Sequence, residues 1–324
     1  MIGYYIHHQG RGHLNRARAV CAQLREPVTA LSTLEAPGDW DGEWLNLADD
    51  SQAKPARRPT ANGTLHWVPL ADEGLRSRMA AIASWIATRR PRLVVCDVSV
   101  EVALLCRLMG TAVATVALPG RRDDDAHAAG YRLSDLILVP WPGRLADPST
   151  ARSWGGRAHF TGAFSRFDGR RPEQAVRPRS VTVLLGEGGS AISQTDIRAA
   201  RAATPGWEWL LLGPGGEWQH DPWQQLCSSE VVVTHAGQNA VAEVAAARRP
   251  AIVIPQDRPF DEQAATGRML AREGLAIVRP AWPRGGEWAD MLADASEADG
   301  GNWVRWSDGY GAHRAARAID ALVL

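Results

Sequence analysis

The chain has 324 residues, of which 36 are basic and 36 acidic, so its formal net charge at pH 7 is zero. This balance removes the main argument for a nucleic-acid partner, which requires a basic face. The length is sufficient for two domains. The cysteines show neither a CxxC pair nor a metal-binding spacing; they are Cys21, Cys96, Cys106 and Cys227. We therefore expect reduced thiols and a cytoplasmic protein.

No apolar run reaches the roughly 18 residues of a transmembrane helix. The chain opens with a short strand pattern, Ile2–Ile6, and not with a charged and then apolar leader, so we expect no signal peptide. Peripheral contact with a membrane stays open.

In the first half of the chain, short apolar runs alternate with amphipathic stretches. The runs predict strands over Ile2–Ile6, Val28–Leu31, Leu65–Val68, Leu93–Cys96, Ala112–Val116 and Leu136–Val139. The amphipathic stretches predict helices over Leu14–Leu24, Leu75–Arg89, Val100–Met109 and Asp125–Leu133. The long polar segment Ala36–Gly63 is interpreted as a mobile acceptor-side loop or a solvated insertion.

The same alternation returns in the second half. Strands are expected over Val181–Leu185, Trp207–Leu212, Val231–Val233, Ala251–Ile254 and Ala276–Val278. Helices are expected over Ser193–Ala203, Asn239–Ala246, Phe260–Glu273, Trp288–Ser296 and Gly311–Leu324. Strands that alternate with helices and are apolar throughout predict an α/β protein with parallel sheets covered on both faces.

The pattern breaks at Gly162–Arg179, a stretch rich in Gly, Pro and Arg. After it the chain restarts with a strand and a glycine-rich loop, as at the N-terminus. We therefore predict an N-terminal domain over 1–162, a linker over 163–179 and a C-terminal domain over 180–324.

The segment Ile6–Arg16 follows the first strand and reads IHHQGRGHLNR. Gly10 and Gly12 allow a tight turn at the start of the first helix and leave room for a substrate. Asn15 stands where a dinucleotide fingerprint has its third glycine, and this departure disfavours NAD and FAD.

His13 follows these glycines and is a candidate general base, because imidazole titrates near neutral pH and can take a proton from an acceptor hydroxyl. A helix-capping role is the alternative, and His7 and His8 compete for the role of base. Asp97 ends a predicted strand, where a carboxylate could orient His13 and stabilise its protonated form. It could equally cap the helix that begins near Val100.

A glycine-rich loop, Gly186-Glu187-Gly188-Gly189-Ser190, opens the second half. A strand, such a loop and a helix in succession form an anion-binding arrangement. Gly188, Gly189 and Ser190 are therefore candidates for contact with a diphosphate, and a plain tight turn is the alternative.

The most informative stretch is Thr234–Gln263, in which an apolar strand leads into a His-Ala-Gly-Gln-Asn turn and a helix. Backbone N–H groups at a helix start suit a diphosphate, a carboxylate farther along the helix suits ribose hydroxyls, and an acid–amide pair on the next loop suits a sugar. The pattern indicates a nucleotide diphosphate-sugar. The candidate donor-binding residues are His235, Ala236, Gly237, Gln238, Asn239, Glu243, Glu262 and Gln263.

At these residues the chain resembles the GT-B glycosyltransferases, in particular the MurG-like and UDP-glycosyltransferase branch. The family's His-x-Gly-x-Asn-x-x-x-Glu signature, the acid–Gln pair after the next strand and the N-terminal Gly-x-Gly-His are all present. The matching residues are His235, Gly237, Asn239, Glu243, Glu262, Gln263, Gly10, Gly12 and His13.

The resemblance implies two Rossmann-like, doubly wound domains facing a central cleft, with the acceptor on the first, the donor on the second, and the last helix returning to the first. It implies inverting transfer from a UDP- or dTDP-linked sugar to a hydroxyl of a small-molecule or lipid-linked acceptor, without metal or cofactor. His13 would be the base and Asp97 its partner. His235 and the backbone after it would bind the diphosphate, Glu243 the ribose, and Glu262-Gln263 the donor sugar.

Two departures from the family pattern stand out. Arg16 occupies the position of the proline in Gly-His-x-x-Pro, and we expect it either near the donor phosphates or facing solvent. The loop Gly186–Ser190 differs from the usual Gly-Gly-Ser. A nucleotide-sugar hydrolase or 2-epimerase on the same fold is an alternative function, and a non-catalytic nucleotide-sugar binding protein is a further one.

Overall fold

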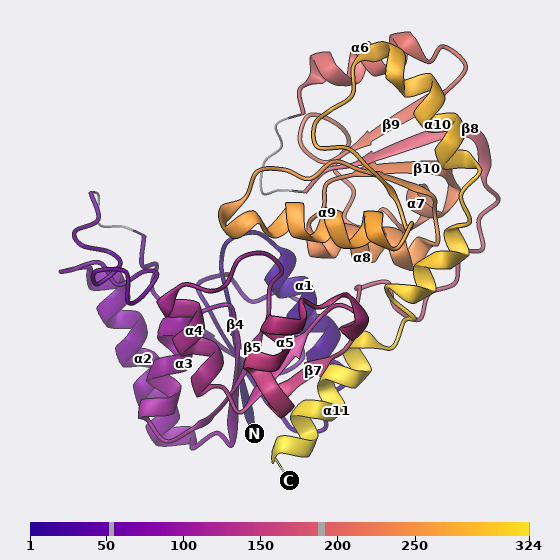
Figure 1. The fold of residues 1–324 in the computed structure, drawn as a ribbon. Helices are drawn as coiled ribbons and strands as arrows, with labels where there is room; N and C mark the ends of the chain where they lie inside the picture. Colours follow the sequence, from indigo (N-terminus) through magenta and orange to yellow (C-terminus); the bar gives the residue numbers. More distant parts are fainter. Residues whose placement is uncertain (52–54, 187–191, 324) are drawn as a thin grey trace. The chain divides into compact units, whose positions relative to one another are not determined.

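The computed structural model describes residues 1–51, 55–186 and 192–323 (Figure 1). Contacts divide the chain into two compact units. The first unit comprises Met1–Leu118, Arg122–Thr161 and Ala312–Leu324, and the second comprises Pro119–Arg121 and Gly162–Gly311. Each unit is built around a parallel sheet flanked by helices, so the α/β class predicted from the sequence is confirmed.

The first unit contains a parallel sheet with the strand order β3-β2-β1-β4-β5-β6-β7. Its strands are β1 (Ile2–Ile6), β2 (Val28–Ser32), β3 (Glu43–Asn46), β4 (Leu93–Asp97), β5 (Ala112–Val116), β6 (Leu136–Val139) and β7 (Ala158–Phe160). The order reverses between β1 and β4, where Ile6 pairs with Asp97. We call the carboxyl ends of β1 and β4 the first switch point, because ligands of open α/β sheets bind where the strand order reverses.

The helices of this unit pack on the two faces of the sheet. They are α1 (Gly12–Cys21), α2 (Glu73–Arg89), α3 (Val100–Leu108), α4 (Asp125–Leu133), α5 (Pro148–Trp154) and α11 (Gly311–Val323), with 3₁₀ turns η1 (Gly143–Leu145) and η2 (Gly155–Arg157). Ile82 of α2 and Val102 of α3 share one buried apolar cluster with the strands. Helices α2, α3 and α4 lie side by side in Figure 1, and each begins at a side-chain cap, Asp72, Ser99 and Asp124 respectively.

The second unit contains a parallel sheet with the order β12-β11-β10-β8-β9. Its strands are β8 (Arg177–Leu184), β9 (Glu208–Leu212), β10 (Ser229–Thr234), β11 (Ala251–Val253) and β12 (Ile277–Val278). The order reverses between β8 and β10, where Leu184 pairs with Thr234. The carboxyl ends of β8 and β10 form the second switch point.

The helices of the second unit bury tryptophans against its sheet. They are α6 (Gln194–Ala203), α7 (Trp223–Ser228), α8 (Gln238–Ala247), α9 (Glu262–Arg272) and α10 (Trp288–Ser296), with 3₁₀ turns η3 (Pro259–Asp261), η4 (Gly285–Glu287) and η5 (Gly300–Arg305). Trp288 is fully buried, and its ring centroid lies 5.1 Å from that of Trp209 and 4.7 Å from that of Trp282. Such aromatic packing contributes large apolar area to a core.

Two elements of the first unit differ from the sequence prediction. The predicted strand Leu65–Val68 is wrong, because this run forms turns and irregular backbone. The N–H groups of His66 and Trp67 donate to the Glu101 carboxylate, at 2.8 and 3.1 Å, and not to a neighbouring strand. Strand β3 lies within the segment predicted as a loop. Its end residues, Glu43 and Asn46, are exposed and polar, so the sequence has no continuous apolar run there. Its backbone pairs only with β2, at the edge of the sheet.

The short elements β7, α5 and α7 were not predicted, since three to seven residues are too few to establish a hydrophobic period. Strand β8 begins at Arg177, inside the stretch predicted as a linker, and α11 belongs to the first unit from Ala312 onward. Among the described residues, none of the helices combines the length and apolar character that crossing a membrane requires.

Candidate functional site

The first switch point brings His13 and Asp97 together. Asp97 is the last residue of β4, and His13 is the second residue of α1, which follows β1 after a short loop. His13 Nδ1 lies 3.1 Å from Asp97 Oδ1, the carboxylate is fully buried, and 17% of the imidazole is exposed. A buried acid therefore holds one ring nitrogen of a histidine that is still partly accessible.

Arg16 is the residue of this cluster that the sequence did not predict. The expectation that it faces solvent is wrong, because its side chain is buried against Asp97, and its nearness to donor phosphates stays a prediction. Nε donates to Oδ2 at 2.9 Å and Nη2 to Oδ1 at 3.0 Å, while Nη2 lies 3.2 Å from His13 Nδ1. A buried carboxylate needs such a partner, and the spacing of His13 and Arg16, one turn apart on α1, was the available signal.

This pairing determines the ionisation of Asp97. Burial by itself would raise its pKa, but Arg16 and then His13 outweigh burial and lower the pKa to about 2. The carboxylate is therefore ionised throughout the physiological range.

His7 and His8 follow β1 near the same cluster. Their rings stack at 4.8 Å, and the His7 ring lies 5.5 Å from that of His13. His7 Nδ1 accepts the Gln9 N–H at 3.2 Å. Burial, with smaller contributions from His13 and His8, lowers the pKa of His7 to about 3, so His7 is a weak base.

The two glycines of this loop differ in what they provide. Gly10 adopts φ +76°, which side-chain-bearing residues rarely adopt, and a Cβ there would meet no atom within 4 Å. Gly10 is thus required by backbone conformation. Gly12 is the first residue of α1.

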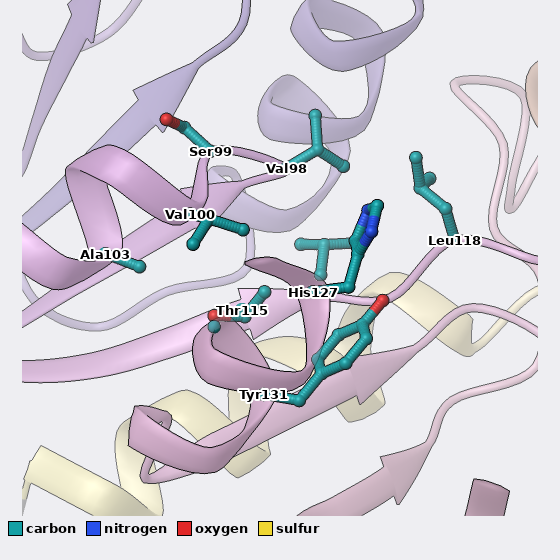
Figure 2. A pocket seen from close by; sticks show the side chains of 10 residues that line it. Val98, Ser99, Val100, Ala103, Thr115, Leu118, His127 and Tyr131 are labelled. Carbon is teal, nitrogen blue, oxygen red and sulfur yellow. The ribbon is translucent and has the colours of Figure 1, made fainter. Parts of the chain in front are cut away.

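A pocket begins at Val98, the residue after Asp97 (Figure 2). Val98 has φ +71°, an unusual conformation for a β-branched residue, and its N–H donates to Cys96 O at 3.1 Å. The pocket is formed by the end of β4, the start of α3, the end of β5 and α4. Its lining residues are Val98, Ser99, Val100, Ala103, Thr115, Val116, Leu118, His127, Gly130 and Tyr131. It is mainly apolar, with a few polar groups, as is common for small-molecule sites.

His127 joins this pocket to a polar network. Its Nδ1 lies 2.5 Å from Asp124 Oδ2, and His66 Nε2 lies 3.1 Å from Asp124 Oδ1. Arg122 Nη1 lies 3.1 Å from His127 Nε2. Because a guanidinium can only donate, His127 Nε2 accepts and its proton resides on Nδ1. Burial, opposed by the hydrogen bond with Asp124, lowers the pKa of His127.

Within the described residues, two groups offer three ligand atoms close enough for a metal ion. One comprises His66, Asp124 and His127, and the other comprises His8, Asp49 and Asp50. In the first, hydrogen bonds among the members and to Arg122 engage the ligand atoms. In the second, Asp50 pairs with the buried Arg78 at 2.7 Å.

At the second switch point, His235 follows β10 directly. Its Nδ1 accepts the Gly237 N–H at 2.9 Å, so the proton resides on Nε2. A Cβ on Gly186 would lie 3.0 Å from Nε2, which places this donor against the backbone that follows β8. Burial, helped by Arg258, lowers the pKa of His235 to about 4, so the ring is a neutral hydrogen-bond donor. The predicted Gly188, Gly189 and Ser190 lie outside the described residues.

Helix α8 begins beside this histidine. Gly237 is its N-cap and Gln238 and Asn239 form its first turn, where N–H groups have no partner within the helix. A Cβ on Gly237 would lie 2.5 to 2.7 Å from His235 ring atoms, so glycine is required here by space. Ala236, just before it, is buried.

Gln263 forms hydrogen bonds with the loops that follow β10 and β11. Its Oε1 accepts the N–H groups of Ala236 and Gln256, at 3.1 and 3.0 Å, and the side chain is buried. The amide nitrogen would lie 3.8 Å from a Cβ on Gly237. Its neighbour Glu262 begins α9, two residues later than the sequence predicts, because Phe260 and Asp261 adopt left-handed conformations.

Glu243 lies on α8, about one turn beyond Asn239, and is buried. Its Oε1 accepts from Arg166 Nε at 2.9 Å, and burial outweighs Arg166 and raises the pKa of the carboxyl. The sequence did not predict Arg166, because it lies in the stretch interpreted as a linker.

The comparisons with known proteins agree with this architecture. Residues 220–281, which include His235 and Gln263, match the glycosyltransferase family 28 C-terminal domain. No curated protein matches the chain by sequence. The glycotransferase of kitacinnamycin superposes with a TM-score of 0.72 at 16% identity, over 99% of this chain and 98% of that one.

Two further solved structures are similar. Phytolacca americana UGT2, complexed with UDP-2fluoro-glucose and pterostilbene, has a TM-score of 0.65 at 16% identity, covering 98% of this chain and 94% of that one. Acinetobacter baumannii MurG has a TM-score of 0.65 at 13% identity, covering 99% and 98%. At these identities the likeness defines the fold. The chain therefore has the GT-B fold, part of its second unit matches the family 28 C-terminal domain, and the resemblance inferred from the sequence is confirmed.

Proposed function

We propose that this protein is an inverting glycosyltransferase that moves a sugar from a nucleotide diphosphate-sugar to an acceptor hydroxyl. The observation that carries this proposal is the placement of His13 on buried Asp97 at the first switch point, in a chain whose second switch point carries the His235–α8 turn. One arrangement suits proton transfer and the other suits an anion.

The reaction proceeds in a single displacement. The acceptor oxygen attacks the anomeric carbon while its proton passes to His13 Nε2. The bond between that carbon and the diphosphate oxygen breaks, and the diphosphate keeps the electron pair. Attack opposite the leaving group inverts the anomeric configuration, and the products are the glycoside and the nucleoside diphosphate.

The second unit binds the donor in this proposal. N–H groups at the start of α8 and the neutral His235 stabilise the leaving diphosphate, which requires no metal ion. Glu243 accepts from the ribose, and Glu262 with Gln263 contacts the sugar. The donor is UDP- or dTDP-linked, in line with the UDP-sugar held by Phytolacca americana UGT2.

The first unit binds the acceptor. The pocket beginning at Val98 is mainly apolar and adjoins Asp97 in the chain, so it suits the apolar part of a small-molecule or lipid-linked acceptor (Figure 2). An Ala103→Leu substitution would fill part of the pocket, and we expect a higher KM for acceptor with unchanged donor affinity. Equal acceptor KM in this variant contradicts the assignment of the pocket.

The direct test begins with a thermal-shift panel of nucleotides and nucleotide-sugars, since a ligand that binds the folded state raises Tm. The donor found in this way is then incubated with and without candidate acceptors, with and without a chelator. Glycoside of inverted configuration, formed at the same rate with the chelator, supports the proposal. Free sugar or an epimer formed from donor alone identifies a hydrolase or 2-epimerase, and binding without turnover identifies a binding protein.

A further inference from the structure

The Arg16 guanidinium contacts both members of the His13–Asp97 pair. It contacts both oxygens of Asp97 and also approaches His13 Nδ1, so three charged or titratable groups meet within 3.2 Å. Asp97 is fully buried and Arg16 nearly so. The contact is thus a built feature of the first switch point.

A carboxylate beside a histidine has two effects that oppose each other in a general base. It orients the ring by accepting the Nδ1 proton, which leaves Nε2 as the proton acceptor. Its negative charge also favours the doubly protonated imidazolium, which cannot accept a proton. A buried and unneutralised carboxylate strengthens the second effect, because Coulomb interactions are less screened there.

Arg16 separates these two effects. Its fork neutralises the carboxylate and fixes the plane of Asp97, while Oδ1 stays 3.1 Å from His13 Nδ1. Because a guanidinium is only a donor and a carboxylate is the better acceptor, the proton between Nδ1 and Oδ1 belongs to Nδ1. The trio then carries no net charge while Nε2 retains its lone pair.

We propose that Arg16 is a positioning residue that neutralises Asp97, so that Asp97 orients His13 without converting it to imidazolium. The proposal rests on the proposed role of His13 as the base. Arg16 does not touch the reacting atoms; it acts through Asp97.

Further titratable groups near His13 lie on β1 and in the loop after it. His7 and His8 both have lowered pKa values, chiefly through burial, so they are neutral at physiological pH. Burial raises the pKa of Tyr4 on β1 well above its ordinary value, so its hydroxyl is also neutral. The charged groups of Asp97 and Arg16 contact the His13 ring directly, at 3.1 and 3.2 Å.

The test follows the His13 ring by ¹⁵N NMR of histidine-labelled protein, with its signals assigned from His13→Ala. In the substrate-free wild type at pH 7.5 we expect the pattern of a neutral ring protonated at Nδ1. In Arg16→Met we expect both ring nitrogens to be protonated, with the titration moved by at least about one pH unit toward higher pH. A neutral ring in Arg16→Met overturns the proposal.

Two matched variants distinguish charge from structural support. Arg16→Lys keeps a positive charge without the fork, so its His13 titration should return most of the way to that of the wild type, although kcat stays low with KM unchanged. Arg16→Met with Asp97→Asn removes both charges and avoids a lone buried carboxylate, so the ring should again be neutral. If Arg16→Lys titrates like Arg16→Met, or the double variant keeps the imidazolium, the proposal is wrong.

The rates give a second and separate readout. In Arg16→Met the acidic limb of the kcat/KM profile should move in parallel with the NMR titration, so that activity recovers at high pH. If no acceptor or donor is turned over at all, the proposed function fails, whereas the substrate-free NMR result still decides the role of Arg16.

Discussion

The two switch points use the same topology for different electrostatic tasks. At the first, a fully buried carboxylate is held by Arg16 and faces His13. At the second, the groups at the ligand edge are backbone N–H donors at the start of α8 and a neutral imidazole, His235. The comparison teaches two requirements. A sheet edge suited to proton transfer needs a titratable group in a fixed charge environment. A sheet edge suited to an anion needs oriented hydrogen-bond donors that stay in one protonation state.

The buried charges of the first switch point also connect function to stability. An ion pair inside a protein adds little net stability, but removing one partner leaves the other charge uncompensated. In the second unit, Glu243 forms an ion pair with Arg166. Glu243 lies more than one turn beyond the start of α8, where the N–H donors are. Substitutions can therefore separate the two tasks.

Asp97→Ala is expected to have the largest effect, because it leaves the buried Arg16 without its carboxylate. The free energy of unfolding should fall by about 3 to 5 kcal/mol, as measured by urea denaturation. Asp97→Asn, which keeps the size and one hydrogen-bond acceptor, should lose less. Equal stability of Asp97→Ala and the wild type would contradict the buried pairing.

His13→Ala should reduce the transfer rate by at least about a hundredfold, the usual range for loss of a general base. Donor affinity, measured by titration calorimetry, should stay unchanged, because His13 belongs to the first switch point. His7→Ala is the matched comparison. A wild-type rate in His13→Ala, or a larger loss in His7→Ala, would remove the role assigned to His13.

The fall in the free energy of unfolding at acidic pH should report the protonation of Asp97. Its pKa is lowered to about 2 in the folded protein, below the value near 3.9 of an unfolded aspartate. The resulting stabilisation is complete above about pH 5, is lost as the pH falls toward 2, and amounts to about 2 to 3 kcal/mol. Comparison of the pH dependence of unfolding in wild type and in Asp97→Asn isolates this contribution. Parallel curves for the two proteins would contradict it.

Glu243→Ala should have the smallest effect, a loss of nucleotide affinity of about tenfold, or ~1.4 kcal/mol, because one ribose contact is removed. Titration calorimetry with the free nucleoside diphosphate measures it, and Glu243→Gln should retain part of the affinity. Since Glu243 also pairs with Arg166, a thermal melt shows whether the variant is folded. Unchanged affinity in a folded Glu243→Ala protein would end the ribose assignment.

The amino-acid sequence determined the features that depend on local pattern. Continuous apolar runs predicted nearly every strand of both sheets, since strands buried on both faces must be apolar throughout. Helix α4 (Asp125–Leu133) and helix α10 (Trp288–Ser296) begin and end where their periodicity predicts. His13 was selected because it follows the glycines at a helix start, and Asp97 because it ends a strand. Strand ends and helix starts meet at one edge of a parallel sheet.

Only the tertiary structure decided the remaining features, because they depend on partners distant in the sequence. Leu65–Val68 reads as a strand, but its N–H groups are taken by Glu101, 34 to 35 residues away. Arg16 reads as a surface or phosphate-binding charge, but the buried Asp97, 81 residues away, requires a counter-charge. Gln263 reads only as a sugar ligand, and the structure adds a second role, because its carbonyl oxygen accepts from the backbone of two loops. Polar side chains take their partners from the folded chain, and no local pattern specifies which partner that is.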